Sequence, residues 1–482
     1  MNPYLILTII AGYFGILMLI SRLTSKNQNN RSFYLAERKS PWYLIAIGMI
    51  GSSISGVTFI SVPGWVITSN FSYMQMVLGY MVGYLVIAYV LLPIYYQFNL
   101  TSIYSFLEDR YNLTAYKTGA WLFLISRTIG SAFRLFIVSR VLQVTVFDPI
   151  GIPFWITVII TILLIWLYSH KGGIKTIIYT DVLQTFFLLT AAILTVYEIS
   201  SLLGWNFSEL VHHIAQSNYS KTFYFDNWHE TNFFWKHFLS GMFITIVMTG
   251  LDQDMMQKNL TCRTLKDAQI NMITYGILFI PINLIFLSLG ALLIIYSQNH
   301  GISLPIKTDD LYPSLAISGT LPPVVTVMFI IGVIAAAYSS ADSALTALTT
   351  SFTVDILNYS HDQLDTPKAV KVRKWVHALI SIVMIGVIIV FNAISNDSVI
   401  SAIFKVAGYT YGPLLGMFAF GIFNKRTPSG WIFPIFAILS PTISYLLQFL
   451  FQKHTGYQMG FELLLLNGFI TYCAIYFFSK KK

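Results

Sequence analysis

Long, nearly continuous runs of apolar residues make up most of the chain, and short polar segments separate them. A helix needs roughly 20 apolar residues to cross the hydrocarbon core of a bilayer. The runs that reach or approach this length are 4–22, 41–68, 73–97, 117–145, 152–169, 176–200, 234–252, 270–297, 322–356, 374–394, 399–423, 430–451 and 461–478. Strands of a membrane β-barrel are much shorter, at about 10 residues, and alternate in polarity. The pattern therefore predicts an all-α integral membrane protein of about 13 transmembrane helices.

The composition excludes a soluble globule of this size. Of the 482 residues, 56% are hydrophobic and 10% are charged, and the mean hydropathy is +0.67, whereas soluble domains carry roughly 25% charged residues. The two cysteines, Cys262 and Cys473, are too few for a disulfide framework or a Cys-rich metal site. The first apolar run has no basic segment before it and no small-residue cleavage site. We therefore expect a spanning helix there and not a signal peptide.

The positive charges gather in alternate loops. With an external N-terminus, 21 of the 29 Lys and Arg residues fall in cytoplasmic loops and four in external loops. The other four, Arg127, Arg134, Arg140 and Lys405, fall inside predicted spans. Cytoplasmic loops of membrane proteins are enriched in Lys and Arg. The bias predicts an external N-terminus and a cytoplasmic C-terminus, and it assigns the net charge of +9 to a lipid bilayer partner and not to nucleic acid.

No low-complexity segment or change in composition divides the chain, so we predict a single transporter domain over 1–482. The two longest connections, about 201–233 and 298–321, are external in this topology and carry Trp, Tyr, Asn and Gly. We expect them to form ordered caps on a compact bundle.

The second apolar run is interrupted near its middle by Gly51-Ser-Ser-Ile-Ser-Gly-Val-Thr58. Free backbone groups in hydrocarbon are costly, so an unwound stretch persists only where it lines a cavity. Transporters use such breaks to bind ions and solutes. The alternative interpretation is close helix packing through small residues.

A polar stripe follows one face of the run 322–356. Its members recur at helical spacing: Ala336, Ser339, Ser340, Ser343 and Thr346. Asp342 lies beside the stripe. A carboxylate inside a membrane predicts a functional site with a partner, and hydroxyl and carboxylate oxygens suit hard cations. A structural Asp–Arg pair or a packing face is the alternative.

Asp181 lies about one turn inside the cytoplasmic end of its span, in the same half of the membrane as Asp342. By itself it is slightly better explained as a charge at a helix N-terminus, where the helix dipole favours it. Arg127 and Arg134 are seven residues apart and share one helical face. Guanidinium groups bind carboxylates well, so one arginine is a candidate to bind an anionic solute and one is a candidate to pair with Asp181 or Asp342; the two readings are about equally favoured. Arg140 is expected to reach the outer surface.

No other chemistry is indicated. The sequence has no GxxxxGK[ST] nucleotide-binding loop and no nucleophile motif, so we predict that the protein is not an enzyme and uses no organic cofactor. Asp252, Asp254 and the segment 257–266 are interpreted as a helix end that enters an internal loop.

Together these segments resemble the sodium:solute symporter family over nearly the whole chain. The residues that carry the resemblance are Ser53-Ile-Ser55 with Thr58, Leu100-Thr-Ser-Ile-Tyr-Ser-Phe-Leu-Glu108 with Arg110-Tyr111, Lys171-Gly-Gly-Ile-Lys175 with Tyr179-Thr-Asp181, Asp252-Gln253 with Gln257-Lys258, the run from Ala335 to Asp355-Ile356, and Gly412-Pro413 with Gly421-Ile-Phe-Asn-Lys-Arg426. The resemblance implies a five-plus-five inverted-repeat transporter fold with a broken first helix in each repeat. It places a peripheral helix at 4–22, repeats at 41–200 and 234–423, and two C-terminal helices at 430–478.

The resemblance also implies where sodium binds. In the family the main site uses backbone oxygens of the first broken helix and hydroxyls of a later core helix, which here gives Gly51, Ile54, Ala336, Ser339 and Ser340. Some members have a second sodium site, whose matching positions are Asp181, Ser339, Asp342 and Ser343. Those members usually have a hydroxyl at the position of Asp342. The added carboxylate could tighten the site, take a proton or pair with Arg134, and the number of sodium ions stays open.

The predicted solute site is most similar to that of bacterial sodium/sialic acid symporters. Its residues are Ser53, Ser55, Thr58, Tyr73, Val77 and Arg134. Arg134 favours an acidic solute. Val77 replaces an expected polar amide and weakens the similarity to sialic acid carriers in particular.

These inferences predict a sodium-coupled symporter that imports a small polar, and in one reading anionic, organic solute such as a sialic acid, a sugar or a monocarboxylate. The expected mechanism is alternating access, with the protein acting as a monomer in the inner (plasma) membrane. One alternative is a proton-coupled carrier that uses Asp181 and Asp342. Another is a membrane sensor that transports nothing.

Overall fold

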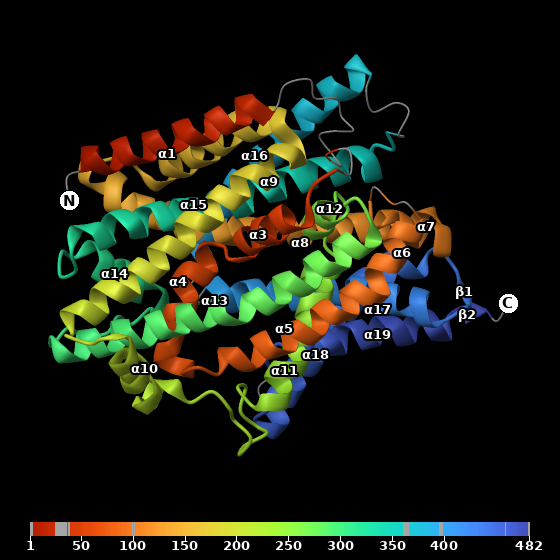
Figure 1. The fold of residues 1–482 in the computed structure, drawn as a ribbon. Coiled ribbons are helices and arrows are strands. Elements are labelled where there is room, and N and C mark those ends of the chain that lie inside the picture. Colours follow the sequence, from red (N-terminus) through yellow and green to blue (C-terminus); the bar gives the residue numbers. More distant parts are fainter. Residues whose placement is uncertain are drawn as a thin grey trace.

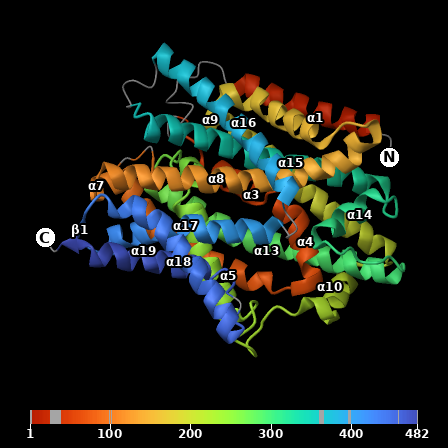
Figure 2. The ribbon, with the colours of Figure 1, turned by 180° about the vertical axis from the view of Figure 1, so that it is seen from behind.

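The computed structural model describes residues 3–24, 36, 39–98, 100, 102–359, 366–394, 399–457 and 459–480. Thr101 of the family resemblance and five of the counted cations, Lys26, Arg31, Arg38, Lys481 and Lys482, lie outside these residues. The described chain is almost entirely helical, as the apolar runs predict. The helices run roughly along one common direction, with the two chain ends at opposite ends of the bundle (Figure 1, Figure 2).

The first part of the chain contains α1 (Pro3–Thr24), α3 (Trp42–Ser53), α4 (Gly56–Ser69), α5 (Tyr73–Val86), α6 (Leu92–Gln97), α7 (Ser105–Arg110), α8 (Leu113–Leu142), α9 (Phe154–Leu202) and α10 (Phe207–Gln216). The second part contains α11 (Phe234–Thr245), α12 (Gln253–Asn259), α13 (Leu265–Asn299), α14 (Leu311–Ile317), α15 (Pro323–Ser351), α16 (Pro367–Ile394), α17 (Val399–Phe423), α18 (Ile432–Thr455) and α19 (Leu463–Phe477). The strands β1 (Thr427–Pro428) and β2 (Ser479–Lys480) pair antiparallel near the C-terminus.

Short helical turns of other geometry extend or join these helices. The π-helical turns are η2 (Ile87–Leu91), η3 (Gln143–Phe147), η6 (Ile246–Gly250) and η8 (Phe352–Ile356). The 3-10 turns are η4 (Asp148–Ile150), η5 (Asn218–Ser220) and η7 (Thr308–Asp310). The connections 201–233 and 298–321 contain α10, η5, η7 and α14, which confirms the expectation that they are ordered.

Each predicted span has a helical counterpart among the described residues. Nine helices are long and apolar enough to cross a membrane, and two bent pairs raise the number to eleven. Two shorter apolar helices, Phe154–Ser169 and Leu463–Phe477, correspond to the remaining predicted spans. The first of these is the initial part of α9, which kinks at Gly173 (φ 56°, ψ −161°). The total of 13 spans therefore depends on whether both short helices cross, and it stays a prediction.

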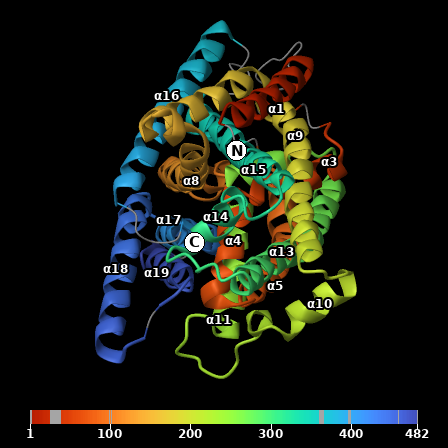
Figure 3. The same ribbon diagram turned by 90° about the vertical axis from the view of Figure 1, so that its left-hand side faces the viewer.

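Burial separates central helices from peripheral ones. In the most apolar stretch of α15, 78% of residues are buried, whereas only 22% are buried in the corresponding stretches of α1 and α18. In the view along the bundle, α15 lies inside, and α1 and α18 lie at the periphery (Figure 3). The exposed side chains of α18 include Ile435, Ile438 and Leu446, which suit contact with lipid and not with water.

Candidate functional site

The first predicted break occurs between α3 and α4, which meet at an angle of 57°. Ile54 (ψ 75°) and Ser55 (ψ 176°) leave the helical conformation. As a result, the carbonyl oxygens of residues 51–54 accept no hydrogen bond from any described residue. Unpaired carbonyls inside a membrane protein are ligands for a cation or line a wet cavity. The interpretation of this segment as an interrupted helix is therefore confirmed.

A second break lies between η6 and α12, where the chain bends by 69°. Asp252 caps α12 by accepting a hydrogen bond from the backbone N–H of Asp254 (3.0 Å), and it accepts another from the Tyr411 hydroxyl (2.5 Å). The interpretation of Asp252 and Asp254 as a helix end entering a loop was wrong, because both are fully buried at the break. Their charges lower the local hydropathy, and the apolar pattern therefore reads as if the span ended there.

The serine stripe of α15 faces the first break. The Ser339 hydroxyl lies 3.5 Å from the Ser52 hydroxyl of α3 and donates a hydrogen bond to Asp181 Oδ1 of α9 (2.6 Å). Ser52 also donates to Asp181 Oδ2 (3.0 Å). Three helices therefore meet at one buried carboxylate. The remaining residues of the predicted main sodium site are also buried: Gly51, Ile54, Ala336 and Ser340.

Gly51 allows α3 and α9 to approach closely. A Cβ atom at this position would lie 2.1 Å from Thr185 Oγ1 and 3.1 Å from the Asp181 carbonyl oxygen. Gly51 therefore allows close helix packing, which was the alternative interpretation of this segment. The break beside it lines a cavity, as the first interpretation predicted. The two interpretations hold together at this segment.

Asp181 has a partner that the sequence did not identify. Lys258 of α12 places its Nζ atom 2.7 Å from Asp181 Oδ2 and donates to the Ser52 hydroxyl. Lys258 is 1% exposed. Counting it among the loop cations was therefore wrong, since the second break carries it into the core. The available signals were the position of Lys258 at the end of the broken span and its place in the Gln257-Lys258 pair of the family resemblance.

Asp342 pairs with neither arginine. Its Oδ2 atom accepts a hydrogen bond from the Tyr168 hydroxyl (2.7 Å), whereas Oδ1 and the Ser343 hydroxyl have no hydrogen-bond partner among the described residues. The predicted second sodium site thus divides into two parts. Asp181 and Ser339 bond to each other beside Lys258, and Asp342 turns toward Tyr168.

The two core arginines of α8 have different surroundings. Arg127 forms an ion pair with Asp254, and its NH1 atom is 3.7 Å from Asp252. The pairing of either arginine with Asp181 or Asp342 was a wrong expectation, because the charges of the second break take that role for Arg127. Arg134 forms no ion pair or hydrogen bond with the described residues, and its guanidinium group borders a cavity.

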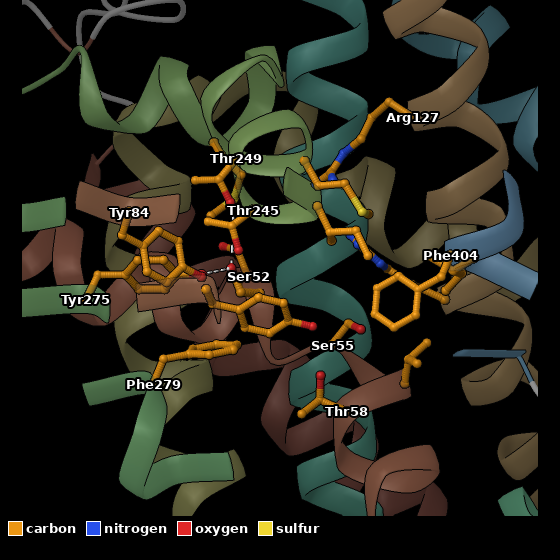
Figure 4. Close-up of a pocket in the computed structure, with 18 of the residues that line it drawn as sticks. Ser52, Ser55, Thr58, Tyr84, Arg127, Thr245, Thr249, Tyr275, Phe279 and Phe404 are labelled. Atoms are coloured by element: carbon orange, nitrogen blue, oxygen red, sulfur yellow. Dashed lines mark hydrogen bonds between the residues drawn. The ribbon is translucent and has the colours of Figure 1, made fainter. Parts of the chain in front are cut away.

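That cavity has a volume of about 100 Å³ and lies beside the first break. Of the predicted solute residues, Ser53, Ser55, Thr58, Tyr73 and Arg134 line it, and Val77 is buried without lining it. Tyr84, Tyr275 and Phe279 lie on one side, Arg127 and Phe404 on the other, and the hydroxyls of Ser55 and Thr58 point between them (Figure 4). Tyr275 donates to Ser53 (2.5 Å) and so holds the aromatic wall against the break.

Sequence reasoning missed most of this wall. Tyr80, Tyr84, Tyr275 and Phe279 line the cavity together with Thr245 and Thr249 of the second broken helix. Aromatic residues are frequent throughout the chain, which contains 29 Tyr and 37 Phe. Their type alone therefore could not distinguish a wall of the site from ordinary helix packing.

Two interrupted helices that meet at a polar centre inside an apolar bundle define a secondary transporter. The sequence model of the sodium:solute symporter family matches residues 33–430, and the chain belongs to this family. Sodium is the coupling ion. The predictions of family, fold class and sodium-coupled symport are confirmed.

Individual relatives agree with the family. The chain is 26% identical over 477 residues to the sodium/sialic acid symporter SiaT of Proteus mirabilis, with 93% of this chain and 91% of the relative covered. It is 26% identical over 434 residues to the sodium/sialic acid symporter NanT of Aliivibrio fischeri, with 86% and 82% covered.

Solved structures show the same fold. A substrate-bound, outward-open Na+-coupled sialic acid symporter matches with a TM-score of 0.82 and 20% identity, over 99% of both chains. Mhp1, a nucleobase-cation-symport-1 family transporter, matches with a TM-score of 0.57 and 14% identity, over 94% of this chain and 96% of that one.

Proposed function

We propose that this symporter imports a small anionic organic solute and that Arg134 binds the solute's acidic group. The observation that carries the proposal is the difference between the two arginines of α8. Arg127 is neutralised by Asp254, whereas Arg134 presents an unpaired guanidinium to the cavity. Arg134 is half-buried, and a cation in the interior of a membrane protein without a counter-ion is costly; an anionic solute would supply that counter-ion. The hydroxyls of Ser53, Ser55 and Thr58 are placed to bind further polar groups of the solute.

The size of the cavity favours a compact solute. A cavity of about 150 Å³ holds benzene, and this cavity measures about 100 Å³. A monocarboxylate of a few carbon atoms fits that scale better than a nine-carbon sialic acid, although relatives of the chain are sialic acid symporters. The aromatic wall would pack against the apolar part of the acid.

Sodium is proposed to bind at Gly51, Ile54, Ala336, Ser339 and Ser340. The free carbonyls of the first break and the neighbouring hydroxyls of α15 support this site. An ion there would hold α3 against α15 and so shape the adjoining cavity. Ion and solute would then raise each other's affinity by the same factor.

The remaining parts of the proposal concern the whole chain. It functions as a monomer in the plasma membrane, with the N-terminus outside, as one domain made of repeats 41–200 and 234–423. The two bent helix pairs, at the start of each repeat, support this division. Rocking of one part of the bundle against the other would expose the site to each side in turn.

The test is sodium-dependent uptake into proteoliposomes of three labelled solutes: lactate, N-acetylneuraminate and galactose. We expect uptake of an acid and not of galactose. Arg134→Gln should raise KM for the acid at least about tenfold, which corresponds to about 1.4 kcal/mol. Arg140→Gln is the matched control, because it removes an arginine from the same helix at a position outside the solute cavity. Arg140 is 43% exposed, and its guanidinium group lies 3.8 Å from the Asp310 carboxylate. Galactose uptake, or an acid KM unchanged by Arg134→Gln, would contradict the proposal.

A further inference from the structure

Lys258 is a fully buried ammonium group at the point where the two broken helices meet. It belongs to α12, the second part of one broken span, and it donates to Ser52 at the end of α3, the first part of the other. Its Nζ atom is 2.7 Å from Asp181 Oδ2 on α9. Figure 1 shows α12 beside α3. A charge buried this deeply persists only when it is paired.

Asp181 is fully satisfied by protein groups. Oδ1 accepts a hydrogen bond from Ser339 (2.6 Å), and Oδ2 accepts from both Ser52 (3.0 Å) and Lys258 (2.7 Å). The ammonium group therefore lies where oxygen atoms of a carboxylate and a hydroxyl converge. Those are the ligands that a hard cation such as sodium would otherwise use.

Sodium and Lys258 cannot use Asp181 together. Both carry a single positive charge, and two like charges at contact distance inside a low-dielectric core repel strongly. Lysine is a compact point charge with three donor hydrogens on a flexible stem, which suits it to stand in for a bound ion. Asp342, the other acidic residue of the predicted second site, accepts a hydrogen bond from Tyr168, and its second oxygen has no partner in the part of the chain that the structure describes.

We propose that Lys258 takes the place of a second sodium ion, so that the protein binds and carries one sodium ion per solute. The tethered ammonium supplies the positive charge that Asp181 requires, and it links both broken helices without an ion from solution. This inference rests on the proposed sodium sites, because it assigns the single sodium to the main site beside Gly51 and Ser340.

The test counts sodium directly on the purified full-length protein by equilibrium binding of ²²Na+, without any solute. We expect one ion per chain in the wild type. Lys258→Gln removes the positive charge and leaves the Asp181 carboxylate available to a sodium ion, so this variant should bind two ions. Lys258→Arg keeps the positive charge and should still bind one ion. Lys258→Gln combined with Asp181→Asn should return to one ion, which places the added ion at Asp181.

Two bound ions in the wild type would overturn the proposal, and this measurement needs no variant to fold. A count of one in folded Lys258→Gln would also overturn it. A separate variant tests the main site independently of Lys258. If the single variant Ser340→Ala, in an otherwise wild-type protein, still binds one ion, the assignment of the main site is wrong. The replacement of a second ion by Lys258 is then judged by the Lys258→Gln count alone.

Discussion

At the scale of residues, the core holds charged groups whose partners come from distant parts of the chain. Arg127 and Asp254 are 127 positions apart, and Lys258 and Asp181 are 77 apart. Each pair joins α12 to a different helix. Because burial of a single charge is far more costly than burial of a pair, these contacts fix the position of the second break relative to α8 and α9.

We predict that Arg127→Gln strongly destabilises the protein, because it leaves Asp254 buried without its counter-ion. Breaking a buried pair typically costs about 3–5 kcal/mol. Arg140→Gln, which removes the half-exposed pair with Asp310, should cost at most about 1 kcal/mol. Thermal unfolding of both purified variants in detergent measures the difference. Equal melting temperatures would show that the Arg127 pair contributes no more than a surface contact.

At the scale of elements, the first bent helix pair and α15 form the proposed ion-binding centre, and the second bent pair packs beside them. The free carbonyls at residues 51–54 arise from the break, and α15 brings its hydroxyls to them through the Ser52–Ser339 contact. A continuous helix would have used these carbonyls in its own hydrogen bonds. The break therefore frees the carbonyls that the proposed sodium site uses, and the packing of α15 places hydroxyl groups beside the break.

We predict that Ser340→Ala raises the sodium concentration for half-maximal uptake at least about tenfold, and that adding Ser339→Ala abolishes sodium-dependent uptake. The first change removes one proposed ligand, and the second also removes a hydrogen bond to Asp181. Ser444→Ala is the control, since this buried serine lies on peripheral α18. Sodium titrations of uptake in proteoliposomes provide the measurement. Normal sodium dependence in the double variant would contradict the main site.

At the scale of the whole molecule, the chain ends lie at opposite ends of the bundle (Figure 2). That placement agrees with an odd number of crossings and with the bias of Lys and Arg toward alternate loops. The cytoplasmic location of the C-terminus is a prediction from the distribution of Lys and Arg among the loops.

We predict that a cysteine at position 221 reacts with an impermeant maleimide in intact cells, and that one at position 425 reacts only after permeabilisation. Lys221→Cys and Lys425→Cys are both made at exposed positions, in a background without Cys262 and Cys473. The reverse labelling pattern would place the N-terminus in the cytoplasm. Labelling at neither position after permeabilisation would mean that exposure differs from that in this structure.

The amino-acid sequence by itself determined the class of protein, the approximate spans, the first break and the serine stripe of α15. These are local properties, because hydropathy, glycine content and helical spacing are read from neighbouring residues. Five of the six solute residues that the family resemblance implies line one cavity, and their role in binding stays a prediction.

Only the tertiary structure decided which charged groups meet. Asp181 and Lys258, or Arg127 and Asp254, lie in contact because helices from both parts of the chain cross there, and no local pattern encodes that crossing. The family resemblance implied a second broken helix, but the local pattern around Asp252 and Asp254 resembles a loop until their buried partners are known. The tyrosine wall was hidden because burial, and not residue type, separates it from the other aromatic residues of the bundle.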